Sequence, residues 1–107
     1  MEKLVAEQLQ VDRSHIWHPY TSFDNPLPVF LVESATGVRI RLQDGRELID
    51  GMASWWSVIH GYNHPRLTQV VQEQAAKLSH VMFGGLTHEP AIKLAQLLIS
   101  HTPPGLD

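Results

Sequence analysis

The stretch Val38-Arg-Ile-Arg-Leu-Gln-Asp-Gly-Arg-Glu-Leu-Ile-Asp50 decides the fold of the first half of the chain. Apolar and charged residues alternate strictly over residues 38–42, which is typical of a strand that buries one face. Asp44-Gly45 signals a tight turn, and residues 47–50 return as a further strand. Upstream, residues 29–32 are rich in β-branched residues, and Ala35-Thr36-Gly37 separates them from residue 38. Residues 29–50 are therefore predicted to form a three-stranded antiparallel meander.

The segment before this meander, residues 1–28, is predicted to contain a helix and an aromatic loop. Apolar residues scattered among charged ones over residues 2–12 predict a short amphipathic helix that ends before His18-Pro19. Prolines mark residues 13–28 as loop. This loop nevertheless carries three aromatic rings, those of Trp17, Tyr20 and Phe23.

The segment after the meander, residues 51–107, begins with an irregular or partly helical crossing, since residues 51–62 fit no period. Pro65 suits the first turn of a helix predicted over residues 65–79. The apolar residues 79–86 contain two adjacent glycines and are predicted to form a loop.

A second helix of this segment is predicted to begin at Thr87, as its N-cap, with Glu89 in its first turn, and to end at Pro103-Pro104. Its expected buried stripe consists of Ile92, Ala95, Leu98 and Ile99. A short N-terminal helix, a three-stranded meander and two further helices make the fold class α+β.

Composition and charge exclude several classes of protein. The 107 residues include eight Lys and Arg against eleven Asp and Glu, and the net charge of −3 lacks the basic surface that nucleic-acid binding requires. The chain has no cysteine, which excludes disulfides and thiolate chemistry. No apolar run approaches the ~20 residues of a membrane span, and the first ten residues resemble no targeting signal. We therefore expect a cytoplasmic protein without nucleic-acid or membrane partners.

The residues alone show no catalytic constellation and no metal site. His60 and His64 stand four apart, but Gly61 and Pro65 break a helix there and no third ligand accompanies them. Structural roles at turns and strand ends account for the carboxylates near residues 44–50. The aromatic residues of the irregular segments, in contrast, are expected as a group to line a pocket; they are Trp17, Tyr20, Trp55, Trp56 and Tyr62.

Four stretches carry a resemblance to a known family: residues 15–21 (HIWHPYT), 44–56 (DGRELIDGMASWW), 60–65 (HGYNHP) and 79–88 (SHVMFGGLTH). They closely resemble the N-terminal part of the adenosylmethionine-8-amino-7-oxononanoate aminotransferases of biotin biosynthesis, a branch of the class III aminotransferases. The paired Asp-Gly motifs and the Gly-Tyr-Asn-His-Pro motif indicate the class, whereas WHPYT, SWW and HVMFGG are more specific to this branch. The likeness covers the chain from about residue 13 onward.

The resemblance implies the architecture of fold-type I pyridoxal-phosphate enzymes and a homodimer with its active site at the subunit interface. It implies transfer of the amino group of S-adenosylmethionine to 7-keto-8-aminopelargonate, which gives 7,8-diaminopelargonate. Tyr20 is implied to line the substrate pocket and stack on the adenine of the donor, and Trp55, with Trp56, to wall the same pocket. The loop Met82-Phe83-Gly84-Gly85 is implied to reach the active site of the partner subunit.

The resemblance also places the catalytic centre outside this sequence. In the family, the lysine that holds pyridoxal 5'-phosphate, the acidic partner of its pyridine nitrogen and its phosphate-binding turn all lie beyond residue 107. Lys3, Lys77 and Lys93 match none of these positions and are expected to be surface charges. We therefore expect an N-terminal fragment with substrate-pocket residues, a cofactor bound mainly by residues beyond it, and no transamination by these residues alone.

Two alternatives stay open. One is another class III aminotransferase, acting on an ω-amino acid, against which the Trp55-Trp56 pair and the stretch 17–20 argue. The other is a non-enzymatic interaction module that binds a partner through its aromatic surface and Val81-Met82-Phe83. Such a module is expected to be a stable monomer, whereas the fragment is expected to expose apolar surface and to self-associate.

Overall fold

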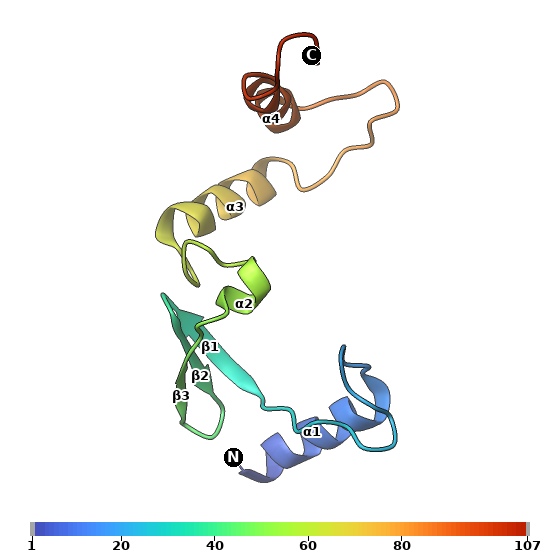
Figure 1. Ribbon diagram of the computed structural model, residues 1–107, viewed down its shortest axis with the longest axis vertical. Coiled ribbons are helices and arrows are strands. Elements are labelled where there is room, and N and C mark those ends of the chain that lie inside the picture. Colours follow the sequence, from blue (N-terminus) through green and yellow to red (C-terminus); the bar gives the residue numbers. More distant parts are fainter. Residues whose placement is uncertain (1, 107) are drawn as a thin grey trace. The chain divides into compact units, whose positions relative to one another are not determined.

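The computed structural model describes residues 2–106 (Figure 1). Along the chain it contains α1 (Glu2–His15), β1 (Val32–Thr36), β2 (Arg39–Leu42), β3 (Glu47–Ile49), α2 (Ala53–Trp56), α3 (Pro65–Lys77) and α4 (Glu89–Ile99). The chain divides into two compact units, residues 1–68 and residues 69–107, and each is described by itself. None of the helices in the described part is both long and apolar enough to span a membrane.

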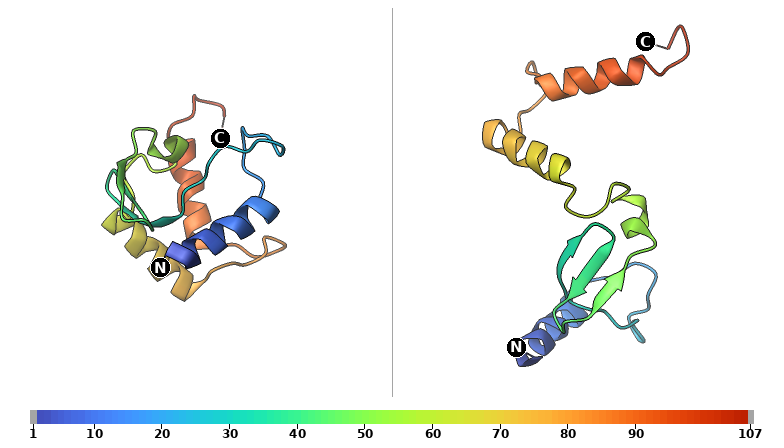
Figure 2. Two further views of the ribbon diagram at one scale, coloured as in Figure 1. Left: turned by 90° about the horizontal axis from the view of Figure 1, so that it is seen from below. Right: turned by 90° about the vertical axis from the view of Figure 1, so that its left-hand side faces the viewer.

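The strands form one antiparallel sheet in the order β1-β2-β3, which confirms the expected meander (Figure 2). The expected position of the first strand, residues 29–32, is wrong, because β1 begins only at Val32. The chain reverses at Gly37, where φ is +58°, so pairing starts with Thr36 opposite Arg39. Val32 pairs with Leu42, the last residue of β2, and Leu31 O still accepts a bond from Gln43 N at 2.9 Å, so residues 29–30 form the approach to β1.

The side chains of β2 alternate in burial as the sequence predicts. Ile40 is half-buried, and Leu42, at 3% exposure, is the one buried apolar side chain among the residues that the structure describes. The arginines of this strand form cross-strand ion pairs at 2.7 and 2.8 Å, between Arg39 and Glu47 and between Arg41 and Glu33. Such exposed pairs add little stability, at most about 1 kcal/mol each, but they favour this register.

α1 is three residues longer than the helix expected over residues 2–12. Its last turn is extended by the bond that Ile16 N donates to Asp12 O at 2.8 Å. The Asp12 carboxylate also bonds the His18 ring at 2.8 Å, just before Pro19. The helix thus ends before His18-Pro19, as predicted, but residues 13–15 belong to the helix and not to the loop expected over residues 13–28.

α3 and α4 confirm the two predicted helices, but α3 ends at Lys77 and not at residue 79, and α4 ends at Ile99, before Pro103-Pro104. Two further details of α4 differ from expectation. The predicted N-cap, Thr87, is wrong: His88 caps the helix, and its Nδ1 accepts a bond from Ala91 N at 3.2 Å. Pro90 has no N–H, so the first amide that needs a side-chain partner is that of Ala91, three residues after His88.

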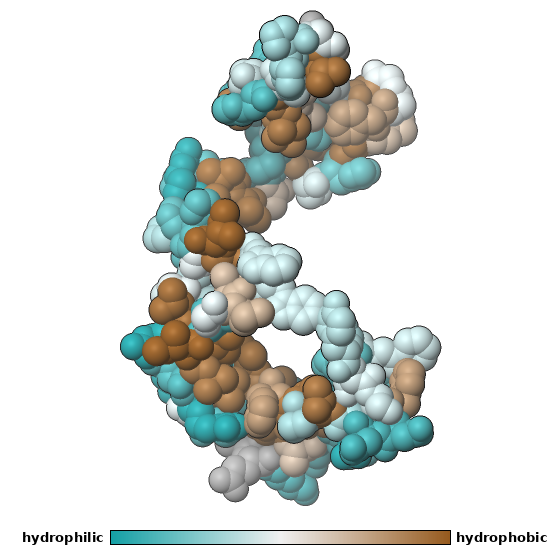
Figure 3. All heavy atoms as spheres, viewed as in Figure 1, coloured by the Kyte–Doolittle hydropathy of each residue, from teal (hydrophilic) through white to brown (hydrophobic). Residues whose placement is uncertain are grey.

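The stripe expected to be buried along α4 is exposed instead. Ile92, Leu98 and Ile99 are 48%, 58% and 48% exposed, and Ala95 is exposed as well. Figure 3 shows hydrophobic side chains open on the surface of this helix and over the sheet. The helical period thus correctly identifies an apolar face, but no described residue covers it.

Candidate functional site

The segment after β3 contains a left-handed turn. α2 spans residues 53–56, and φ is +47° at Ala53, +44° at Ser54, +55° at Trp55 and +67° at Trp56. This conformation costs non-glycine residues about 1–2 kcal/mol each, because Cβ crowds the following carbonyl. The crossing expected to be irregular or partly helical is therefore a strained turn that other contacts must hold.

The Asp50 carboxylate is the principal contact of this turn. Oδ1 accepts a bond from Met52 N at 2.9 Å, and Oδ2 accepts one from Ser54 N at 2.8 Å. The Tyr62 hydroxyl donates to Oδ2 at 2.5 Å and is also hydrogen-bonded to the Ser54 hydroxyl. The bond from Tyr62, followed by that from the Ser54 amide, holds the pKa of Asp50 below its ordinary range, and the same carboxylate raises the pKa of Tyr62.

Tyr62 reaches this carboxylate because its backbone pairs with the turn between β1 and β2. Gly37 N donates to Tyr62 O at 3.0 Å, and Tyr62 N donates to Gly37 O at 2.7 Å. Gly61 has φ of +84°, and a Cβ there would lie 3.0 Å from Gly37 O. The close approach of the two segments therefore requires glycine at position 61.

The left-handed turn places an aromatic ring beside the N-terminal loop. The ring centroids of Trp55 and Tyr20 are 5.0 Å apart, and the ring planes are inclined by 59°. Both rings keep open surface, since Trp55 is 55% and Tyr20 is 82% exposed. Trp55, but not Tyr20, also lines an open hollow of about 510 Å³, together with Ile40, Asp50, Met52, Ser54 and Ser57.

The structure brings together only part of the aromatic group that the sequence suggests. Tyr20 and Trp55 meet, and Tyr62 supports the turn that carries Trp55 through its hydroxyl. Trp56 lies next to this pair in sequence but is 80% exposed. Trp17 does not join them, because its ring packs edge-to-face against Phe23.

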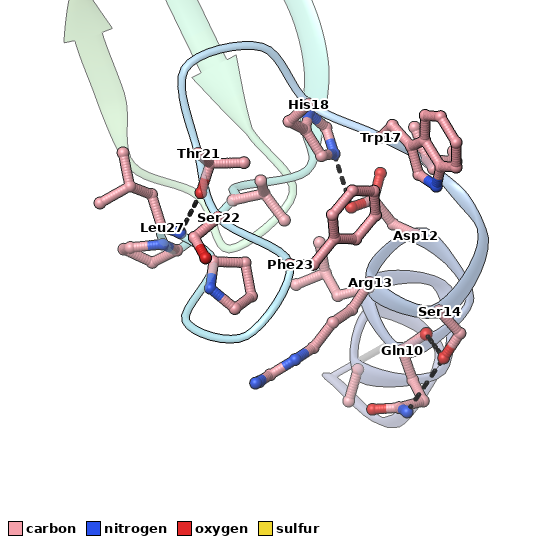
Figure 4. Close-up of a pocket in the computed structure, with 16 residues that line it drawn as sticks. Gln10, Asp12, Arg13, Ser14, Trp17, His18, Thr21, Ser22, Phe23 and Leu27 are labelled. Carbon is pink, nitrogen blue, oxygen red and sulfur yellow. Dashed lines mark hydrogen bonds and ion pairs between the residues drawn. The ribbon is translucent and has the colours of Figure 1, made fainter.

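A second hollow, of about 620 Å³, lies between α1 and the loop that follows it, and Figure 4 shows the side chains that line it. Its side chains include the Trp17–Phe23 pair, with centroids 5.1 Å apart, and the bonded Asp12 and His18. Neither ring of the pair described above lines it. One helix and one loop wall this hollow, and it contains no residue that the resemblance assigns to substrate.

The loop Met82-Phe83-Gly84-Gly85 lies in the second unit. The side chains of Met82 and Phe83 are 64% and 61% exposed, and the Phe83 ring meets the His88 ring edge-on at 5.1 Å. Gly85 has φ of +84°, which favours glycine. A Cβ at either glycine would meet no described atom within 4 Å. Steric crowding among the described residues therefore does not explain why the two positions are glycine.

The histidines give no metal centre in the described part of the chain. The rings of His60 and His64 lie with centroids 6.0 Å apart, and no group of three or more possible ligands occurs among residues 2–106. Ser54 binds Tyr62 rather than a basic side chain. Among the described residues, Ser54 is therefore not paired with a base.

Sequence reasoning missed the roles of Asp50, Ser54 and Tyr62. It assigned Asp50 to a strand end and Tyr62 to the pocket lining. The available signal was an Asp-Gly dipeptide followed by an unperiodic segment that closes on a glycine, which marks a loop needing an internal acceptor.

Comparison with protein families decides the class. The family model described as aminotransferase class-III matches residues 20–107, most of the chain. This chain belongs to the class III aminotransferases. The match begins at Tyr20 and includes the sheet, the left-handed turn and both later helices.

Several curated class III relatives carry one name, adenosylmethionine-8-amino-7-oxononanoate aminotransferase. The relative from Buchnera aphidicola subsp. Baizongia pistaciae is 57% identical over 98 residues, which are 92% of this chain and 23% of the relative. The relative from Saccharomyces cerevisiae is 50% identical over 99 residues, 89% of this chain and 21% of its own length. The chain therefore spans less than a quarter of the length of these relatives.

Solved structures agree with the class III assignment. The adenosylmethionine-8-amino-7-oxononanoate aminotransferase of Methanocaldococcus jannaschii matches with a TM-score of 0.82 and 26% identity, over 92% of this chain and 23% of that one. An aminotransferase of Bacillus anthracis matches with a TM-score of 0.80 and 32% identity, over 92% and 21%. These matches confirm the expected fold class, the N-terminal segment of a fold-type I aminotransferase.

Class III aminotransferases depend on pyridoxal phosphate, but the residues described here do not form a site for it. No lysine lines either hollow in the described part of the chain. Lys77 and Lys93 instead lie 3.9 and 2.5 Å from Glu89 in the second unit, and the Lys93 bond is the main cause that lowers the pKa of Glu89. Lys77 and Lys93 are thus exposed side chains paired with a carboxylate, as expected of surface charges.

Proposed function

We propose that the complete protein, meaning a protein of the relatives' length that contains residues 1–107, transfers the amino group of S-adenosylmethionine to 7-keto-8-aminopelargonate. The observation that carries the proposal is the 57% identity to a relative named for this reaction, over 92% of the chain. Such an enzyme provides a step of biotin biosynthesis. Its pyridoxal phosphate is bound mainly by residues outside this chain.

In this proposal Tyr20, Trp55 and Trp56 bind substrate. The open faces of Tyr20 and Trp55 support it, because an aromatic ring with a free face can stack on a planar base such as the adenine of the donor. The hollow beside Trp55 has polar groups of Ser57 and Asp50 next to apolar Ile40, a mixed lining that suits a polar substrate with an aliphatic chain.

The proposal extends to the assembly. The exposed loop 82–85 contacts the active site of a second subunit, so the complete enzyme is a homodimer, and it works in the cytoplasm. The support is the exposure of Met82 and Phe83 together with two glycines that meet no described neighbour. Light scattering of the complete protein would measure the subunit number.

The test of the proposed reaction is an assay of the complete protein with S-adenosylmethionine and 7-keto-8-aminopelargonate, comparing Trp55→Ala with the unaltered protein. Loss of one stacking ring is expected to raise the KM for the donor by about 5- to 150-fold, the equivalent of about 1–3 kcal/mol. Trp17→Ala is the matched control, because Trp17 packs on Phe23 away from the proposed pocket, and it is expected to leave the KM unchanged.

A second candidate, an ω-amino acid aminotransferase, is favoured by the fold alone. The ω-transaminase of Pseudomonas jessenii matches with a TM-score of 0.75 and 28% identity over 88% of this chain and 21% of that one. Turnover with β-alanine as amino donor, and none with S-adenosylmethionine, would select this candidate. Turnover with S-adenosylmethionine would reject it.

A further inference from the structure

We infer that Asp50 and Tyr62 are positioning residues, which hold the left-handed turn of residues 53–56 so that the Trp55 ring faces Tyr20. The inference rests on the proposed function, in which Trp55 and Tyr20 wall the substrate pocket. Neither Asp50 nor Tyr62 is assigned a contact with substrate; both act through the tryptophan.

The backbone hydrogen bonds within the turn of residues 53–56 are not enough to stabilise it. Four consecutive residues have positive φ and none of them is glycine. The backbone bonds within the turn are long: Trp56 N to Met52 O is 3.2 Å, Ser57 N to Ser54 O is 3.3 Å, and Val58 N to Ala53 O is 3.1 Å. All three are longer than the commonest N–H···O length of about 2.9–3.0 Å, and the bond from Ser57 N lies beyond the ordinary range, so they compensate poorly for the strain.

The Asp50 carboxylate supplies the shorter bonds. Met52 N and Ser54 N donate to its two oxygens at 2.9 and 2.8 Å. Bonds to an ionised acceptor are shorter and stronger than those between neutral groups. One side chain thus fixes the amides at the entry to the turn and inside it, immediately before Trp55.

Tyr62 fixes the carboxylate. Its hydroxyl bonds both Asp50 and the Ser54 side chain, which closes a ring of hydrogen bonds around the start of the turn. The Tyr62 backbone is itself held by two bonds to Gly37 of the sheet. Hydrogen bonds thus connect the sheet to Tyr62, Tyr62 to Asp50, and Asp50 to the turn that carries Trp55. These bonds fix the orientation of the Trp55 ring relative to the sheet.

The experiment is a double-mutant cycle in the complete protein between Tyr62→Phe, which removes one hydroxyl, and Trp55→Ala. Tyr62→Phe is expected to raise the KM for S-adenosylmethionine about fivefold or more, as expected for a lost hydrogen bond of ordinary strength, with kcat within twofold of the unaltered protein. In the Trp55→Ala background the same substitution is expected to leave the KM unchanged, because it acts through the missing ring. Equal effects in both backgrounds, or no effect in either, would overturn the inference.

Near-ultraviolet circular dichroism gives a readout that does not depend on the proposed reaction. Tyr62→Phe is expected to alter the tryptophan band in a protein that contains Trp55 and to leave it unaltered in a Trp55→Phe background. If that coupling is seen while Trp55→Ala leaves donor binding intact, the positioning stands and the proposed function fails. If Trp55→Ala weakens donor binding but the band shows no coupling, the positioning fails and the proposed function stands.

Two further variants keep the result interpretable. Ser54→Ala removes the other hydroxyl of the hydrogen-bonded ring and replaces Tyr62→Phe if that protein does not fold; the same non-additivity with Trp55→Ala is expected. Glu47→Gln is the control, since it breaks an exposed ion pair on the same sheet without touching the turn, and its KM and circular dichroism are expected to match the unaltered protein.

Discussion

At the scale of single residues, Gly61 is the position where the backbone leaves least choice. It combines φ of +84° with a Cβ position 3.0 Å from Gly37 O and 3.2 Å from Gly37 Cα. Gly45 has a similar φ of +88° in the turn between β2 and β3, but a Cβ there would meet nothing within 4 Å. A positive φ is present at both glycines, but steric overlap would arise only at Gly61. Comparing the two positions therefore distinguishes the cost of backbone strain from that of overlap.

We predict that Gly61→Ala destabilises the complete protein by about 2–4 kcal/mol, since left-handed strain and backbone overlap add. Gly45→Ala, the matched control, is expected to cost only the strain, about 1–2 kcal/mol. Thermal unfolding of the two variants measures the difference. Equal shifts in the unfolding midpoint would contradict the close approach of the segments around Gly37 and Gly61.

The residue scale is also where sequence reasoning fell short. The sequence suggests a group of five aromatic rings, and the resemblance implies pocket roles for Tyr20, Trp55 and Trp56, but neither predicts which rings meet; the structure places those of Tyr20 and Trp55 5.0 Å apart. The Asp50–Tyr62 bond was not foreseen, because it joins residues twelve positions apart and depends on the pairing of Tyr62 with Gly37. A left-handed turn of four non-glycine residues contradicts local propensity, so tertiary contacts must specify it.

At the scale of elements, the regular periods predicted most of the structure. Strict alternation located β2, and helical spacing after Pro65 located α3. β1 was misplaced because valine and phenylalanine in residues 29–32 favour a strand wherever they lie, whereas the turn at Gly37 decides which residues can pair with β2. The N-cap of α4 was misplaced by one residue because a threonine is the commoner cap, whereas Pro90 shifts the first free amide to Ala91.

His88, the N-cap of α4, is expected to stabilise the first turn of this helix. His88→Ala is expected to remove the side-chain acceptor of Ala91 N, which then keeps only its bond to His88 O at 3.2 Å. The loss is expected to destabilise the start of α4 by about 0.5–2 kcal/mol, so that amide exchange at Ala91 becomes about 2- to 30-fold faster. His88→Asn is expected to restore slow exchange, because asparagine is a good N-cap. Thr87→Ala is the control, and faster exchange in that variant with none in His88→Ala would identify Thr87 as the cap.

At the scale of the whole molecule, the described residues bury very little. Leu42 is the one buried apolar side chain among them, while large side chains of the sheet and of α4 stay open to solvent, including Leu48, Ile49, Leu94 and Leu97 (Figure 3). Stability of a small domain depends on apolar burial, and a chain of this length is marginal even with a complete core. The curated relatives are more than four times as long as the matched stretch. In a protein of that length, the additional residues can cover the apolar surfaces that are exposed here.

We therefore predict that residues 1–107 expressed alone self-associate and bind the dye ANS strongly, whereas the complete protein binds it weakly, because contiguous exposed apolar surface drives both effects. Light scattering gives the association state, and ANS fluorescence per mole of protein gives the exposed apolar surface. Leu98→Glu on α4 serves as the internal check: Leu98 belongs to the exposed apolar stripe of the helix, and a charge there is expected to reduce self-association of the isolated chain. A soluble monomer that unfolds cooperatively and does not bind ANS would contradict this prediction and favour an autonomous interaction module, since only a chain that covers its own apolar faces behaves in that way.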